Sequence, residues 1–174
     1  RGSLLRIRPS TGDTLWSVRT NRGGFYRMRP ILKDDRLYAG TQSGEKTEFV
    51  ALDAETGQVI WRNTEARVYA AEMAAGTIFV NTGRDVMALS KETGETLWRA
   101  GLEAGHGESG LAYLDEYVYH PHGVGMRVIE SETAEVVHIE WPENGYFWAV
   151  GVGAGKVFAQ DSGALYAFEP YSPE

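Results

Sequence analysis

Three of the four histidines of this chain, His106, His120 and His122, lie close together in the sequence. His120 and His122 flank one residue, so on an extended strand both side chains point to the same side. Neutral imidazoles placed in this way can share a metal ion. No carboxylate other than Glu108 lies at an obvious ligand spacing. We therefore name the three histidines as candidate metal ligands but expect no metal site, and we expect them to be surface or loop residues.

A second candidate is a local basic cluster of Arg22, Arg27 and Arg29. If Arg27 and Arg29 share a strand, their side chains face one side together. A guanidinium there binds a carboxylate through a bidentate fork, as a quinone carboxylate or an acidic peptide requires. The alternative is pairing with Glu or Asp of an adjacent sheet.

A third candidate is an aromatic segment with four rings around a Pro-Glu-Asn-Gly turn: Trp141, Tyr146, Phe147 and Trp148. If the rings are exposed, Tyr146 and Trp148 are candidates for contact with a ligand or partner, because exposed aromatic residues are typical of interaction hot spots. If they are buried, they pack between neighbouring sheets. No Ser-His-acid arrangement and no phosphate-binding loop stands out, so the sequence offers no catalytic residue.

The candidate residues lie in a chain that is built from a degenerate sequence repeat. Its best copy is Ala51–Trp61 (ALDAETGQVIW), and further copies are Ala88–Trp98, Arg6–Trp16, Val128–His138 and the partial Ala167–Pro170. The last residues of the four full copies, Trp16, Trp61, Trp98 and His138, are 45, 37 and 40 residues apart. A period near 40 with strand-like segments indicates a propeller or another stacked array.

Alternating apolar and polar residues divide each repeat into four short strands. The strands are predicted at 27–32, 36–41, 48–53 and 58–63, at 69–75, 77–82, 85–90 and 95–100, at 108–114, 117–121, 126–130 and 135–140, and at 147–153, 156–160 and 164–168. The prediction is an all-β chain of about four β-propeller repeats, each a blade of four antiparallel strands. Within a single propeller region, 1–174, the blades are 25–64, 65–103 and 104–141, with partial blades at 1–24 and 142–174.

The turn inside each repeat has a physical reason for its residues. Gly12, Gly57 and Gly94 can take positive φ without a Cβ clash, and Asp53 can accept hydrogen bonds from turn amides. The rings of the three repeated tryptophans can then pack on a neighbouring blade. We interpret the motif residues as structural: Ala51, Asp53, Thr56, Gly57, Trp61, Thr93, Gly94, Trp98, Gly12 and Trp16. Ala134 and His138 replace the glycine and tryptophan in the fourth copy, which predicts weaker docking there.

The pattern Ala-x-Asp-x-x-Thr-Gly-x-x-x-Trp, complete in Ala51–Trp61, resembles the tryptophan-docking motif of the quinoprotein-like β-propellers. The family includes pyrroloquinoline-quinone (PQQ) dehydrogenases, which need a complete ring, a calcium ion, a catalytic Asp and a Trp floor for the quinone. It also includes BamB-like and sensor propellers without a cofactor. The resemblance, with no assignable catalytic Asp, favours a non-catalytic scaffold or sensor that binds a protein or peptide. The alternatives are part of a PQQ-dependent dehydrogenase, with PQQ and calcium, and a carbohydrate-binding surface protein.

Composition excludes several classes of function. The net charge is −7, which argues against binding of nucleic acid or of anionic membranes. There is no cysteine, which excludes disulfides and thiolate chemistry. No apolar run approaches a membrane span and no targeting segment is recognised. An extracytoplasmic location, periplasmic or at the cell surface, is implied by the family resemblance alone.

Both ends of the chain align to the third strand of a repeat. Two interpretations follow: the chain is a segment of a propeller of seven or eight blades, or it is a half-ring that pairs with a second copy to complete eight. The second interpretation predicts a two-fold homodimer.

Overall fold

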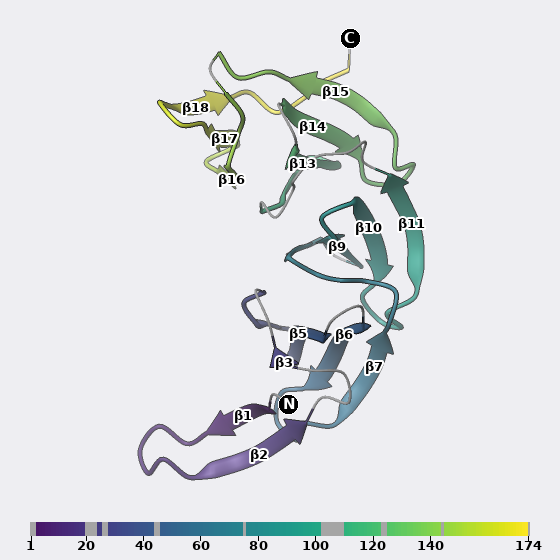
Figure 1. Cartoon of the computed structure of the whole chain (residues 1–174), viewed down its shortest axis with the longest axis vertical. Coiled ribbons are helices and arrows are strands. Elements are labelled where there is room, and N and C mark those ends of the chain that lie inside the picture. Colours follow the sequence, from purple (N-terminus) through teal and green to yellow (C-terminus); the bar gives the residue numbers. More distant parts are fainter. Residues whose placement is uncertain are drawn as a thin grey trace. The chain divides into compact units, whose positions relative to one another are not determined.

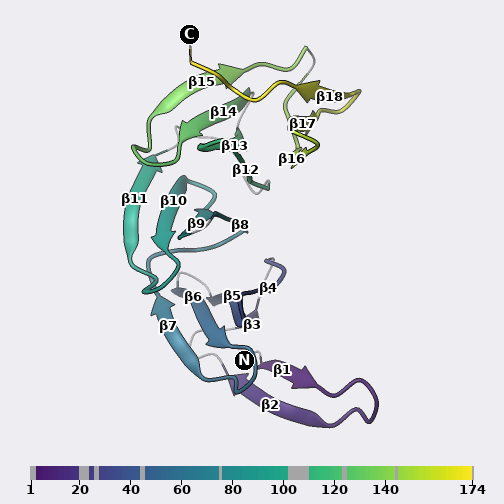
Figure 2. The ribbon, with the colours of Figure 1, turned by 180° about the vertical axis from the view of Figure 1, so that it is seen from behind.

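The computed structural model describes residues 3–19, 24–25, 28–43, 46–74, 76–101, 110–122, 125–143 and 145–173, in which every helix or strand assigned is a β-strand (Figures 1 and 2). Every strand pair is antiparallel, and most join strands that are consecutive in the sequence. The all-β prediction is therefore confirmed, with strands that lie within a few residues of those expected. No helix in the described residues is long and apolar enough to cross a membrane.

The chain forms two compact units. The first contains Arg1–Val68 and Thr93–Glu95, and the second contains Tyr69–Glu92 and Thr96–Glu174.

The first unit holds two sheets. A hairpin joins β1 (Ser3–Ile7) to β2 (Thr14–Arg19), and a larger sheet contains β3 (Gly24–Phe25), β4 (Ile31–Lys33), β5 (Arg36–Ser43), β6 (Lys46–Asp53) and β7 (Val59–Asn63). Ala39, Val50 and Leu52 of the larger sheet form a buried cluster against which Leu4 and Val18 of the hairpin pack. Burial of these apolar side chains is what holds the two sheets together.

The innermost strand of this larger sheet differs from the expectation. Instead of one strand at 27–32, two short strands, β3 and β4, each pair with β5. Arg29 and Pro30 lie between them and are exposed. Pro30 has no backbone N–H to donate to a ladder, which explains why strand pairing resumes only at Ile31.

The second unit holds three sheets. Two have four strands: β8 (Ala70–Met73), β9 (Thr77–Asn81), β10 (Asp85–Ser90) and β11 (Thr96–Gly101), and then β12 (Ala112–Leu114), β13 (Tyr117–His122), β14 (Gly125–Glu130) and β15 (Val136–Glu140). The third has β16 (Ala149–Gly153), β17 (Lys156–Gln160) and β18 (Leu165–Phe168).

Two apolar clusters hold the second unit together. Phe79, Val86 and Ala88 of one sheet pack with Val118 and Ile129 of the next. On the other face of that sheet, a separate cluster joins it to the third sheet through Tyr119, Met126, Val128, Phe147 and Val157. The sheet β12–β15 is therefore covered on both faces, which explains why five of the six residues of β13 are buried.

The same irregularity recurs in every hairpin that carries the motif. The register shifts between Arg6 and Ile7, between Ala51 and Leu52, between Ala88 and Leu89, and between Val128 and Ile129. A bulge adds local twist and re-aims the following side chains. The repeated sequence thus encodes a repeated bulge as well as a repeated turn.

Candidate functional site

The motif turn in the first unit receives a tryptophan from the preceding hairpin. Trp16 Nε1 donates a hydrogen bond to the Ala54 carbonyl at 3.1 Å. Gly57 has φ of 75°, and a Cβ added to it would lie 2.7 Å from Cδ2 of Trp16. The glycine is therefore required twice, by the backbone conformation and by the approach of the ring.

Asp53 organises that turn. Its Oδ1 accepts hydrogen bonds from Thr56 N at 2.7 Å, Thr56 Oγ1 at 2.8 Å and Glu55 N at 3.1 Å. These bonds, the Thr56 amide foremost, lower the pKa of the Asp53 carboxyl below its usual value. A carboxylate held in this way caps a turn, so its surroundings explain it without any role in catalysis.

Trp61 makes the same kind of contact with the next motif turn. It is 7% exposed, and its ring lies against Gly94, where an added Cβ would be 2.5 Å from Cδ2. Asn63 Nδ2 donates to the Gly94 carbonyl at 2.8 Å. The tryptophan ring also packs edge-on against Phe49, with centroids 5.7 Å apart.

The fourth copy keeps the docking contact in the second unit despite its substitutions. Trp98 Nε1 donates to the Ser131 carbonyl at 2.8 Å, and Ala134 takes φ of 67° where the other copies have glycine. The alanine is thus accommodated by backbone strain, which costs about 1 kcal/mol or more.

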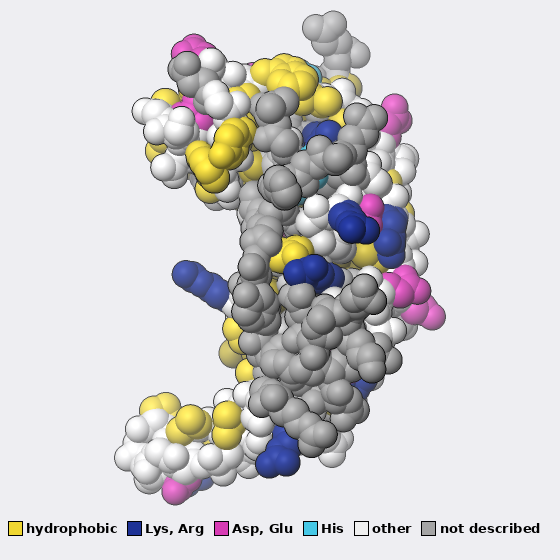
Figure 3. All heavy atoms as spheres, in the orientation of Figure 1, with side chains coloured by type: hydrophobic (Ala, Val, Ile, Leu, Met, Phe, Trp, Pro, Cys, Tyr) yellow, Lys and Arg dark blue, Asp and Glu magenta, His cyan; other side chains and the backbone are white. Residues whose placement is uncertain are grey.

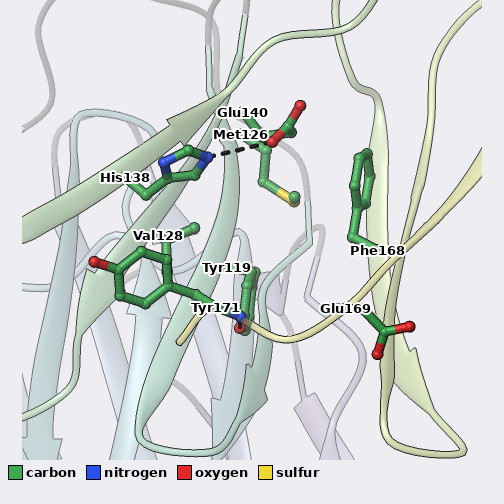
Figure 4. A pocket seen from close by; sticks show the side chains of 8 residues that line it. All are labelled: Tyr119, Met126, Val128, His138, Glu140, Phe168, Glu169 and Tyr171. Atoms are coloured by element: carbon green, nitrogen blue, oxygen red, sulfur yellow. Dashed lines mark hydrogen bonds and ion pairs between the residues drawn. The ribbon is translucent and has the colours of Figure 1, made fainter. Parts of the chain in front are cut away.

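His138, which stands where the other copies have tryptophan, has a different partner. Its ring stacks on Tyr171 with centroids 5.8 Å apart, and Nε2 lies 3.2 Å from Glu140 Oε2. Tyr171 N donates to the hydroxyl of Tyr119 at 2.9 Å. Around these rings lies a small cavity of about 160 Å³, which Met126, Val128, Phe168 and Glu169 also line (Figure 4). The repeat pattern gave no signal for Tyr171, because this residue lies after the last copy.

The aromatic segment between β15 and β16 divides into buried and exposed rings. Phe147 is buried and packs at right angles to Tyr166 and Phe168. Tyr146 and Trp148 are 43% and 54% exposed, with ring centroids 4.3 Å apart, and Trp141 is 59% exposed. In the space-filling view, hydrophobic side chains come to the surface over this part of the second unit (Figure 3). Packing between sheets thus applies to Phe147, while Tyr146 and Trp148 are left available for contact.

The histidine pair lies elsewhere than expected. His120 and His122 are 0% and 4% exposed, because β13 extends to His122 and its sheet is covered on both faces. The expectation of surface or loop histidines is therefore wrong for these two. Their rings lie 5.5 Å apart. Among the described residues no group of three His, Cys, Asp or Glu could hold a metal ion.

The basic cluster and His106 complete the set of predicted site residues. Arg22, Arg27 and His106 lie outside the described residues. Arg29 is exposed and precedes β4 instead of lying on a strand.

Known proteins resemble both the sequence and the structure. Residues 1–135 match the family described as outer membrane protein assembly factor BamB. Outer membrane protein assembly factor BamB of Alteromonas naphthalenivorans is 34% identical, in an alignment that covers 45% of this chain and 23% of that protein.

Two crystal structures share the fold at low sequence identity. BamB from Moraxella catarrhalis superimposes with a TM-score of 0.77 at 18% identity, over 97% of this chain and 56% of that one. Saccharomyces cerevisiae Sqt1 gives 0.74 at 16% identity, over 97% and 53%. The chain therefore spans little more than half the length of these structural relatives.

Proposed function

Because the chain belongs to the PQQ-like repeat family described as outer membrane protein assembly factor BamB, we propose that it is a non-catalytic β-propeller module that binds a protein or peptide partner. Outer membrane protein assembly in the relatives suggests an extracytoplasmic setting and a partner from that process. A partner in that setting would meet the module through exposed side chains on its surface.

The observation that carries the proposal is the exposed ring pair Tyr146–Trp148. Each ring has about half of its surface in solvent, and the two rings lie in contact next to the buried anchor Phe147. Aromatic residues held on a packed base dominate the energetics of protein interfaces. Two exposed rings in contact beside a buried one therefore form a candidate contact surface.

The two carboxyl groups whose pKa is lowered, Asp53 and Asp161, are held in structural contacts. The perturbed carboxylates have structural partners: Asp53 caps its turn, and Asp161 accepts from the Gly163 and Ala164 amides and from the Tyr166 hydroxyl, each at 2.7 Å. No group of three His, Cys, Asp or Glu that could hold a metal ion occurs among the described residues, so no residue is assigned to a calcium-bound quinone. We therefore derive no reaction through PQQ.

The proposal is tested by capture from a periplasmic extract with the full chain as bait. We expect one protein partner to be retained by the unmodified chain and lost when Tyr146 and Trp148 are both replaced by serine. Leu97→Ser is the matched control, because Leu97 is 57% exposed but lies on β11. Retention of the same proteins by all three baits would refute a role for the aromatic pair.

Carbohydrate binding is the second candidate, because exposed rings also stack on sugars. A glycan array separates the two: binding of a glycan that Trp148→Ser abolishes favours it, and an array without signal removes it.

A further inference from the structure

Comparison of equivalent positions in successive sheets identifies one pair that breaks the pattern. His120 on β13 is the register partner of Arg127 on β14. The equivalent partners are Ala39 and Val50 in one sheet and Val80 and Met87 in another. The position that holds an apolar pair in those two sheets therefore holds a histidine and an arginine in the sheet β12–β15.

Of this pair, His120 is fully buried and Arg127 is half-buried. His120 has no exposed surface, and neither of its ring nitrogens has a hydrogen-bond partner within the described part of the chain. Arg127 Nη1 is also buried without an acceptor among the described residues. Native proteins rarely leave such groups unsatisfied, and an exception needs an explanation, such as a bound molecule. The buried cluster that contains Val118 of β13 is apolar, so its side chains offer no hydrogen-bond acceptor.

The missing group must be a hydrogen-bond acceptor. Burial, with smaller contributions from His122 and Arg127, lowers the pKa of His120 to about 3, so the ring is neutral and offers one N–H donor and one acceptor. Arg127 offers donors only. A metal ion would leave Arg127 without an acceptor and add positive charge beside it, whereas a carboxylate accepts from both residues.

We infer that the His120–Arg127 pair is a binding site for a carboxylate carried by a peptide segment of the partner. This rests on the proposed function and names the chemistry of that partner. The position agrees with it: Met126 pairs with Glu140, the last residue of β15, and His122 pairs with Gly125. Both residues of the pair therefore lie near the end of the sheet from which the segment with Tyr146 and Trp148 departs.

The test uses the full chain, acetate as the probe, and the ring nitrogen signals of His120 in long-range ¹H–¹⁵N spectra at neutral pH. Acetamide and chloride at equal ionic strength are the controls, because neither is a carboxylate. Arg127→Met and His120→Val are the matched variants, since Met87 and Val80 fill these positions in the preceding sheet. The loss of signals in His120→Val assigns them.

We expect acetate to move the His120 signals along a saturable curve, with acetamide and chloride inert. Arg127→Met should weaken the apparent affinity by about tenfold or more, the effect of losing one charge-assisted bond of about 1.4 kcal/mol. An acidic peptide such as acetyl-Asp-amide should act like acetate.

Three results would overturn the inference. Signals that do not move with acetate mean that only water occupies the pair. Equal movement in Arg127→Met means that acetate acts elsewhere. Binding of acetate without binding of any peptide means that the ligand is a small carboxylate. None of these depends on capture of a partner through Tyr146 and Trp148, so the two proposals fail separately.

Discussion

Replacement of Gly94 by alanine is expected to destabilise the chain by about 3–5 kcal/mol, and replacement of Gly12 by only about 1 kcal/mol. Both glycines have positive φ, 74° and 79°, so the backbone strain from a Cβ is similar at each. Their surroundings differ. A Cβ on Gly94 would lie 2.5 Å from Cδ2 of Trp61, whereas a Cβ on Gly12 meets no atom within 4 Å. The pair therefore separates the cost of φ from the cost of displacing the docked ring.

The larger figure follows from the ring. Carbon atoms normally approach to about 3.5 Å, so the Trp61 ring must retreat by about 1 Å, which forfeits much of its dispersion contact with the turn. Complete loss of a buried tryptophan costs about 3–5 kcal/mol, which bounds this term. About 2–3 kcal/mol of displacement added to about 1–2 kcal/mol of strain gives the predicted total.

Urea unfolding followed by circular dichroism measures both variants against the parent chain. The expected result is a difference of at least about 2 kcal/mol between Gly94→Ala and Gly12→Ala with unchanged m-values. A difference below about 0.5 kcal/mol would refute the argument that ring docking, and not backbone conformation alone, requires glycine at position 94.

The remaining predictions concern the backbone strain at Ala134, the protonation of His120 and the binding of PQQ. Ala134→Gly should leave stability unchanged or raise it by up to about 1 kcal/mol in the same assay, because it relieves φ of 67°; a loss above about 1 kcal/mol would contradict this. Since the pKa of His120 is lowered to about 3 in the folded chain, the unfolded chain takes up the proton first on acidification. Stability should then fall by about 1.4 kcal/mol per pH unit below pH 6; His120→Val should flatten this slope in urea titrations at pH 4–7, and an equal slope would refute it. Addition of PQQ and calcium should change neither the absorption spectrum nor dye reduction, and any quinone-dependent reduction would contradict a non-catalytic role.

Most of the fold could be predicted from the repeat, because the same physical requirements recur in each copy. Apolar alternation located the strands, and the Thr-Gly pair located the turns. The predicted strand at 27–32 was wrong, because Pro30 interrupts strand pairing there. No other copy has a proline inside its first strand, so comparison between copies could not reveal this interruption.

The candidate site was less predictable, because its features depend on contacts between sheets. The sequence indicated an aromatic segment but could not divide it into the buried Phe147 and the exposed Tyr146 and Trp148. Burial of His120 was missed for a similar reason. A strand that ends near a loop is expected to be exposed, while here β13 is buried to its last residue.

A repeat protein contains its own controls, and these decide which departures from the pattern need a function. His138 departs from tryptophan, yet Tyr171 stacks on it and Glu140 lies within hydrogen-bond distance, so packing explains the change. Ala134 departs from glycine, and the strained backbone absorbs the change. His120 and Arg127 also depart, from apolar pairs that fold without them, and no described group satisfies their buried nitrogens. Folding explains the first two departures and works against the third, so selection for binding is the cause we assign to His120 and Arg127.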